Sequence, residues 1–385
     1  MDVPVTASVI RWAIAQSGYA PEELDSQIRV SPGTVRRWAR GDADPNWTEL
    51  KRLAGVLKRP VAAFFLPEPP TTDLPAISFR SPPGATRKKA NPQELRYIRE
   101  ASRLQRVLAW LRRETENKGT DLPRESISAS PADVAVNVRQ LLGVSAEQQS
   151  SWGSPSVAFD EWRKAFEKLG IYVFLFSLGP ASSKGFSLWN DTAPVIAANT
   201  HWNDAARVFT LFHELGHLVT RTSSVCLNPA NHVHVAHGDA QERWCETFAS
   251  GALIPSNTLK DFLQQRFRRS SGKKISRLED LKSVANHFNV SLRAAALRLI
   301  EAEAAMWDLY TSLPPVADNK RQGGGGSGRV RREIREDSFG RLTAQTFVTG
   351  VKRDLISHYD ALTYLNISYS DFSAWERGES GRARP

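Results

Sequence analysis

Cysteine is scarce in this chain, and long hydrophobic runs are missing from it. Only Cys226 and Cys245 occur among the 385 residues, without the paired spacing of a cysteine metal site, which favours a reducing cytoplasm. No apolar run approaches the roughly 20 residues that span a membrane. The first residues also lack the basic and then apolar layout of a signal peptide. We therefore expect a cytoplasmic protein without a membrane partner.

Positive charge, in contrast, is in excess. The formal net charge is +10 at pH 7, and the lysines and arginines are spread along the chain. Such a balance is compatible with a nucleic-acid partner and equally with a basic soluble protein. The length predicts two or three domains.

The most informative motif is the pentapeptide His213-Glu214-Leu215-Gly216-His217. On a helix, residues four apart project from the same face, so His213 and His217 could bind one metal ion. Glu214 lies beside them, where it could act as general base and then general acid. This H-E-x-x-H arrangement is typical of zinc peptidases, in which zinc lowers the pKa of water toward about 7.

The surrounding sequence favours the metal-site interpretation over a chance pair of histidines. The short apolar run 193–199 predicts a buried strand that ends in a polar residue. A helix then begins, with Thr200 or Asn203 as the candidate N-cap. Its apolar residues recur at helical spacing and should face the core: Val208, Leu211, Phe212, Leu215, Leu218 and Val219.

A catalytic zinc ion usually has three protein ligands, so one more is needed. The H-x-x-G-x-x-H continuation is absent after His217, and the third ligand must come from further along the chain. Residues 241–249 predict a second amphipathic helix. On it Glu242 and Glu246 lie one turn apart, and the spacing alone leaves either one as the candidate.

From residue 195 to residue 255 the sequence resembles the ImmA/IrrE family of metallopeptidases. That family typically shows a strand ending in Asn, a Phe-Thr-x-x-His-Glu-x-Gly-His helix, and a second helix that begins with glutamate. The resemblance implies an α+β, zincin-like, gluzincin-like domain with one Zn²⁺ per chain. It also implies that Glu242 is the third zinc ligand, after His213 and His217. The family's usual Asn or Asp is Glu246 here, which leaves Glu246 as a rival ligand or as a partner of a ligating histidine.

Three histidines lie between the two predicted helices. His232 and His234 alternate with valines, as on a short strand or hairpin, and His237 follows. A surface loop explains them without any function. The alternative is that one of these imidazoles stabilises the oxyanion that forms when water attacks a peptide carbonyl.

The N-terminal residues 10–61 resemble a helix-turn-helix of the XRE (Cro and phage-repressor) type. In that arrangement Ser31 would cap the second helix. Two positions depart from the family pattern: its small residue at the helix crossing is Asp25, and its turn glycine is Arg29. Because an unpaired buried charge is costly, Asp25 must be solvated or paired. The expected core residues of this module are Leu24, Ile28, Val35 and Trp38.

The helix of this module that would enter a DNA groove offers few base contacts. Its first positions are Pro32 and Gly33, which have no side-chain donor, so Arg36, Arg37 and Arg40 remain for phosphates or guanine. The module therefore either contacts DNA or docks to another protein, for example a similar helix-turn-helix.

The predicted organisation has six parts, of which the flanking domains are mostly helical. Three helix-turn-helix-like pieces recur along the chain, and the Gly-rich run 323–328 should be a flexible tether. The parts are a helix-turn-helix domain (1–66), a Pro-rich linker (67–92), the zincin-like domain (93–260), a helical segment (261–314), a Gly-rich linker (315–330) and a small basic helical segment (331–385).

Two functions are compatible with this sequence. The first is a cytoplasmic zinc metallopeptidase that makes limited cuts in a regulatory protein, such as a helix-turn-helix repressor or antitoxin, as the resemblance implies. The second is a non-catalytic XRE-type regulator or antitoxin whose peptidase-like domain senses or scaffolds. The complete set of His213, Glu214 and His217 favours the enzyme, because a scaffold does not need Glu214.

Overall fold

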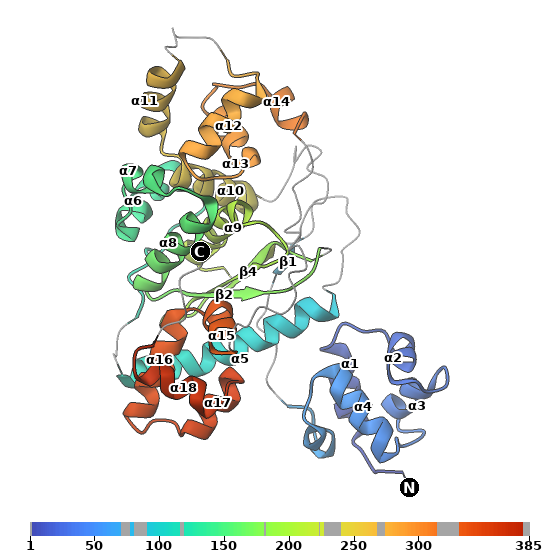
Figure 1. The fold of residues 1–385 in the computed structure, drawn as a ribbon. Helices are drawn as coiled ribbons and strands as arrows, with labels where there is room; N and C mark the ends of the chain where they lie inside the picture. The colour runs from blue at the N-terminus through green and yellow to red at the C-terminus, as the bar shows by residue number, and fades with distance from the viewer. Residues whose placement is uncertain are drawn as a thin grey trace. The chain divides into compact units, whose positions relative to one another are not determined.

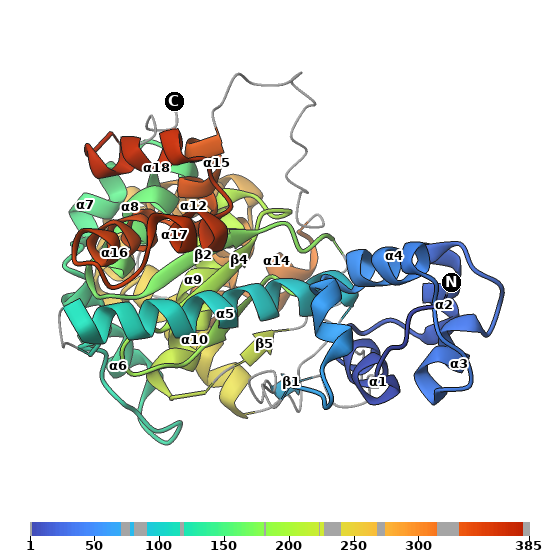
Figure 2. The same ribbon diagram turned by 90° about the horizontal axis from the view of Figure 1, so that it is seen from below.

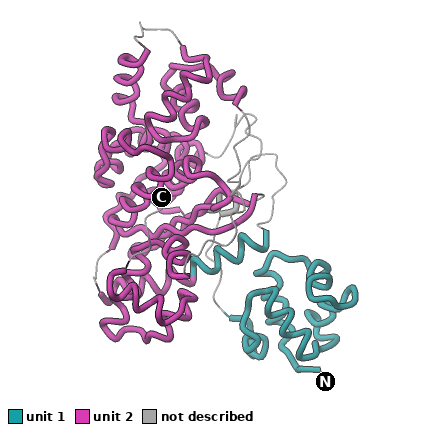
Figure 3. The backbone as a smooth tube through the Cα atoms, in the orientation of Figure 1, with its two compact units in different colours: residues 1–79, 86–102 teal, residues 80–85, 103–385 magenta. Residues whose placement is uncertain are grey.

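The computed structural model describes nine stretches of the chain, which fall into two compact units (Figure 3). Unit 1 comprises residues 1–79 and 86–102, and unit 2 comprises residues 80–85 and 103–385. Two groups of sequence predictions, on His232, His234 and His237 and on the Gly-rich run 323–328, lie outside the described residues. The described stretches are 2–70, 78–80, 91–115, 119–180, 182–222, 224–226, 240–267, 274–313 and 331–379.

Unit 1 holds a small helical bundle. Its apolar residues at helical spacing meet in one core, in which Leu24, Val35 and Trp38 are at most 2% exposed. The first half of the long helix α5 (Pro92–Thr115) also belongs to this unit, and Figure 2 shows that helix along its length. The bundle consists of α1 (Ala7–Ala15), α2 (Pro21–Ile28), α3 (Thr34–Arg40), α4 (Trp47–Leu57) and the short 3-10 helix η1 (Val61–Phe65).

Asp25 is buried between α2 and α3, and its carboxylate caps α3. The Oδ2 atom accepts a hydrogen bond from the Gly33 N–H at 2.7 Å, and Oδ1 accepts one from the Val35 N–H at 2.8 Å. The prediction that Ser31 caps this helix is wrong, because α3 begins at Thr34 after Gly33. The buried charge is instead stabilised by the N–H groups that a helix N-terminus leaves free.

Three turns between consecutive helices share one local pattern. Each turn begins with a non-glycine residue whose φ lies between 52° and 60°, at or just after the end of the first helix. An apolar residue follows it, and then a serine. The turns are residues 29–31, 289–291 and 366–368. Ser291 and Ser368 each cap the following helix through a hydrogen bond from its third N–H group. In the first turn Asp25 takes over that function.

The sheet of unit 2 is small and carries the site. Its strands β2 (Tyr172–Phe176), β3 (Gly185–Leu188), β4 (Val195–Asn199) and β5 (Ser224–Cys226) lie in the order β5-β3-β4-β2. Strand β4 pairs parallel with β2 and antiparallel with β3, and β3 pairs antiparallel with β5. The short strand β1 (Ser78–Arg80) falls at the division between the two units.

Helices cover both faces of this sheet, which is why every residue of β2 and β4 is buried. On one face, Val173 and Leu175 join the core formed with α8 (Pro155–Lys168) and α9 (Asp204–Val219). On the other face, Phe174 and Phe176 contact the ring of Phe339 in α15 (Arg331–Phe339) at centroid distances of 5.6 and 6.2 Å. Figure 1 shows the two helical layers on opposite sides of the sheet.

The C-terminal segment is thus a packed part of unit 2. Besides α15 it contains α16 (Arg341–Lys352), α17 (His358–Leu365) and α18 (Tyr369–Glu376). The Tyr172 hydroxyl lies 2.9 Å from the Thr346 hydroxyl, and Arg163 donates a hydrogen bond to the Asp337 carbonyl at 2.8 Å. These contacts join α15 and α16 to β2 and α8.

The remaining helices of unit 2, apart from α7 (Ala146–Ser151), contribute buried residues to the same hydrophobic core as α8, α9 and the sheet. They are α6 (Pro131–Leu142), α10 (Ala240–Leu253), α11 (Ser256–Phe267), α12 (Leu278–His287), α13 (Leu292–Glu301) and α14 (Trp307–Thr311). The whole is α+β, as predicted, with mostly helical surroundings of a small sheet. Within the described part of the chain, no helix combines the length and the apolar character that crossing a bilayer requires.

Candidate metal centre

The helix α9 carries the H-E-x-x-H pentapeptide. Its N-cap and its buried apolar residues, both recognisable in the sequence, fix its position. Asn203 is the N-cap, and its side chain accepts a hydrogen bond from the Ala206 N–H at 2.9 Å. The predicted apolar stripe is buried, and Phe212 packs edge-on against Trp162 at a centroid distance of 4.7 Å. With that stripe fixed in the core, His213 and His217 project from the neighbouring face.

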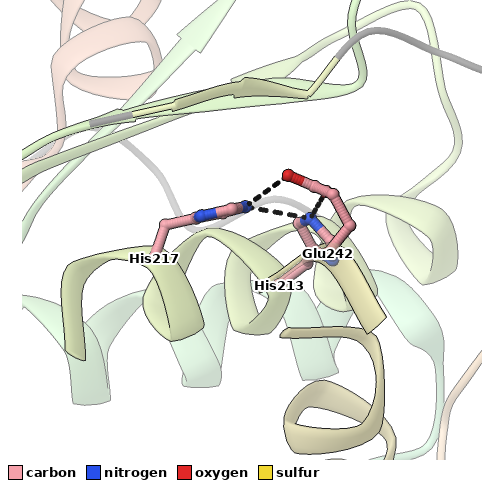
Figure 4. Close-up of side chains that lie close together, drawn as sticks. All are labelled: His213, His217 and Glu242. Carbon is pink, nitrogen blue, oxygen red and sulfur yellow. Dashed lines mark hydrogen bonds and ion pairs between the residues drawn. The ribbon is translucent and has the colours of Figure 1, made fainter. Parts of the chain in front are cut away.

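The helix α10 brings a carboxylate to the same place. Its buried stripe includes Trp244 and Phe248, whose rings stack at 5.4 Å, and the Trp244 indole donates a hydrogen bond to the Ala129 carbonyl at 2.9 Å. Glu242 lies in the first turn of this helix and points toward the two histidines (Figure 4).

Three potential ligand atoms converge there. The distance from His213 Nε2 to His217 Nε2 is 3.3 Å. Glu242 Oε2 lies 3.2 Å from His213 Nε2, and Glu242 Oε1 lies 3.4 Å from His217 Nε2. This is the group among the described residues whose His, Cys, Asp and Glu atoms lie close enough to hold a metal ion.

The spacing of these atoms fits a zinc ion. A tetrahedral ion with ligand bonds of ~2.0–2.1 Å holds its ligand atoms about 3.3 Å apart. The three separations, 3.3, 3.2 and 3.4 Å, are close to that value, with the two carboxylate distances made by different oxygens of Glu242. Two imidazoles and one carboxylate are also a donor set that catalytic zinc sites use, with the fourth position left for water or substrate.

The electrostatics of the cluster show a strong attraction between its members. Burial lowers the pKa of His213, but its hydrogen bond with Glu242 and the charges of the nearby carboxylates outweigh this and raise the pKa overall. Burial likewise raises the pKa of Glu242, whereas the hydrogen bonds and charges of His213 and His217 move it far below its usual range. The carboxylate is therefore ionised and available to a cation.

Glu214 lies inside the protein beside the strand that faces α9. Its side chain is fully buried. A Cβ atom at Gly185 would lie 3.5 Å from Glu214 Cγ, 2.5 Å from Thr210 Cγ2 and 2.6 Å from the Ala197 carbonyl oxygen. Only a glycine therefore fits where β3 crosses α9. This close approach was not predicted from the sequence, although an isolated glycine in a strand is a known sign of one.

The other predicted site residues lie elsewhere. Glu246 is one turn beyond Glu242, and its pKa is raised by burial, with His213 opposing that rise. It is not in the three-residue cluster. Arg36 pairs with Glu22 in unit 1, and Arg37 donates a hydrogen bond to Thr34 at 3.3 Å. Arg40 is exposed.

Two polar residues behind His217 were missed by the sequence reasoning. Thr222 follows the end of α9, and its hydroxyl oxygen lies 3.3 Å from His217 Nδ1. Gln241 precedes Glu242 on α10, and its side-chain nitrogen lies 3.4 Å from the same atom. The only sequence signal for them was the general rule that ligating histidines have a second hydrogen-bond partner.

A small sheet crossed by a helix with two histidines, and a second helix that supplies a carboxylate, define a metallopeptidase-like domain. The comparison with protein families agrees with this class. The family model described as "Peptidase_M78: IrrE N-terminal-like domain" matches residues 166–300, a span that contains His213, Glu214, His217 and Glu242. This supports the ImmA/IrrE family for that part of the chain. No curated protein and no solved structure matches the chain significantly.

Proposed function

We propose that this chain is a cytoplasmic, zinc-dependent metallopeptidase that makes limited cuts in a regulatory protein. The observation that carries the proposal is the convergence of one ligand atom each from His213, His217 and Glu242, all within 4.8 Å of one another, which could hold one metal ion. The family match over the same residues supports it.

Each residue has a defined part in the proposed reaction. His213, His217 and Glu242 would hold the Zn²⁺, which when bound supplies Lewis-acid activation of water and of a peptide carbonyl. Glu214 accepts a proton as water attacks the carbonyl carbon. It then donates that proton to the amine nitrogen as the C–N bond breaks. The buried position of Glu214 next to Gly185 keeps bulk water away from this proton transfer.

A helix-turn-helix repressor or antitoxin is the substrate class that we propose. It follows from the resemblance to the ImmA/IrrE family and from the helical N-terminal module, which would select the substrate. Arg36 pairs with Glu22, whereas Arg37 and Arg40 are exposed, and contacts from such arginines to phosphates would not read bases. A salt-dependent shift on arbitrary DNA that is lost in an Arg36→Ala/Arg37→Ala variant would instead favour nucleic-acid contact.

The test uses the full chain and its Glu214→Gln variant, each loaded with zinc. Both are incubated with the repressors and antitoxins encoded beside the gene, and fragments are identified by mass spectrometry. We expect wild-type protein to cut one of them at a defined bond. Glu214→Gln should keep its zinc, measured by elemental analysis, and should not cut. Glu161→Gln, which removes an exposed carboxylate on α8, is the matched control and should cut normally.

Two outcomes would contradict the proposal. Cleavage by Glu214→Gln at the wild-type rate would exclude Glu214 as the base. A wild-type protein that holds zinc and binds the repressor without cutting it would favour the non-catalytic regulator.

A further inference from the structure

Behind the proposed zinc ligand His217 lies a small hydrogen-bond network. His217 Nδ1, the ring nitrogen that faces away from His213 and Glu242, is 3.3 Å from Thr222 Oγ1. The Gln241 amide nitrogen is 2.5 Å from the same Thr222 oxygen and 3.1 Å from Thr220 Oγ1. The network thus joins the end of α9 to the first turn of α10.

The backbone explains how Thr222 reaches this place. The helix α9 ends at Val219, and Arg221 adopts a left-handed conformation with φ of 57°. That residue reverses the chain, so the Thr222 N–H donates a hydrogen bond to the His217 carbonyl at 2.9 Å. The Thr222 side chain is thereby placed against the imidazole of the same residue.

The network can accept the proton that a metal-binding His217 would carry on Nδ1. The one proton of the Thr222 hydroxyl can go to the His217 carbonyl oxygen or to Thr220 Oγ1, each at 3.2 Å, and its lone pairs are then left to accept. The Gln241 amide nitrogen can only donate, and Thr222 Oγ1 is its nearest acceptor. A metal ion on Nε2 requires the His217 ring proton on Nδ1, and Thr222 Oγ1, 3.3 Å from Nδ1, can then accept it.

We propose that Thr222 and Gln241 are positioning residues that fix the tautomer and the ring orientation of His217 for metal binding. This inference rests on the metal site of the proposed function. Gln241 directly precedes Glu242 in α10. One helix turn therefore supplies both the proposed ligand Glu242 and a residue that supports the other proposed ligand, His217. The sequence left Glu246 open as a rival ligand or as a partner of a ligating histidine, whereas His217 Nδ1 is contacted by Thr222, whose oxygen accepts from Gln241 at 2.5 Å.

The test measures metal affinity and the geometry of the bound metal in the full chain. Zinc dissociation constants are obtained by competition with a chelator, and Co²⁺ loaded in place of zinc gives a visible absorption band that reports on ligand geometry. Thr222→Val removes the hydroxyl at constant size. We expect its zinc affinity to fall roughly 10- to 100-fold, as is typical when a partner of a ligating histidine is removed. Its Co²⁺ band should change as well.

Three further variants make the result specific. Thr222→Ser restores the hydroxyl and should return the affinity and the Co²⁺ band to their wild-type values. Thr343→Val removes a buried hydroxyl of α16 that donates to the Phe339 carbonyl at the end of α15, and should leave metal binding unchanged. Gln241→Leu should weaken zinc binding, and in combination with Thr222→Val it should add little, because both act through one network.

The outcomes separate the two proposals. If wild-type protein binds no zinc, both the proposed function and this inference are overturned. If wild-type protein binds zinc and folded Thr222→Val and Gln241→Leu bind it equally well with an unchanged Co²⁺ band, the inference alone is overturned. Circular dichroism establishes that each variant is folded, and Gln241→Leu serves as the test if Thr222→Val is not.

Discussion

Gly216 in α9 lies directly against Cys245 in α10. A Cβ atom at Gly216 would come within 3.1 Å of Cys245 Sγ and 3.3 Å of Cys245 Cα. This contact sets the distance between the helix that carries His213 and His217 and the helix that carries Glu242. The absence of a side chain at Gly216 therefore lets α9 and α10 approach closely enough to bring Glu242 to the two histidines.

Gly216→Ala should weaken zinc binding without unfolding the protein. The added methyl group forces α10 outward by a few tenths of an ångström, which draws the Glu242 carboxylate away from the histidines. The fold should survive, because alanine is favoured over glycine inside a helix by about 1 kcal/mol. The measurement is the zinc dissociation constant, together with the melting temperature of the metal-free protein.

Gly251→Ala is the matched control for this prediction. Gly251 also lies in α10, but a Cβ there would meet Ala135 Cβ at 3.5 Å, which is ordinary van der Waals contact. Its zinc affinity should equal that of wild type. Equal zinc affinity in Gly216→Ala and wild type would show that the spacing of α9 and α10 does not control the site.

Removal of Glu242 should abolish tight zinc binding, whereas removal of Glu246 should not. Glu242→Ala takes away the carboxylate that lies within 3.4 Å of both imidazoles, which leaves two of the three ligands found among the described residues. Glu246→Ala removes a carboxylate on the same helix that lies outside the cluster. Zinc content after dialysis, measured by elemental analysis, distinguishes the variants. Full zinc in Glu242→Ala together with loss of zinc in Glu246→Ala would reverse the ligand assignment.

The helices and strands around the site could be predicted because their signals are local. The apolar stripe from Val208 to Val219 and the buried run 195–199 each fix an element and the face it buries. The support of His217 could not be predicted, because it depends on a left-handed turn at Arg221, a residue type with no preference for that conformation.

The packing of the C-terminal helices on the sheet was not predicted, although the sequence of one strand indicates that both of its faces are covered. Residues 172–176 are apolar at every position, so both faces of that strand need cover. One cover is α8 with α9, and the other is Phe339 of α15. Which distant segment supplies such cover is a tertiary property, and nothing local in residues 331–339 specifies it.

Asp25→Ala should destabilise unit 1. The substitution leaves the buried Val35 N–H and the Gly33 N–H without the carboxylate that accepts from them at 2.7–2.8 Å. The loss of a helix cap costs about 0.5–2 kcal/mol, and we expect a value at the upper end because the site is buried. Calorimetric unfolding of the full chain measures it. Ser26→Ala, an exposed neighbour on α2, is the control, and equal stability of both variants would refute the capping role.

Glu167 should make the stability of unit 2 depend on pH. Burial raises the pKa of this carboxyl group, although the charge of Arg163 and a hydrogen bond from the Leu342 N–H oppose the rise. The folded-state pKa therefore lies above the unfolded value of about 4.3. The stabilising contribution of the protonated group is fully present below that unfolded value and is lost as the pH rises through the folded pKa.

Glu167→Gln tests this, because glutamine stays neutral at every pH. The free energy of unfolding of wild type, relative to Glu167→Gln, should fall as the pH is raised from about 4.3 through the folded-state pKa of Glu167 and should level off above it. Urea titrations across that range give the difference. Glu161→Gln changes an exposed carboxylate on the same helix and should show no such fall. A difference between wild type and Glu167→Gln that does not change with pH would mean that Glu167 stays ionised beneath α16 with its charge fully compensated.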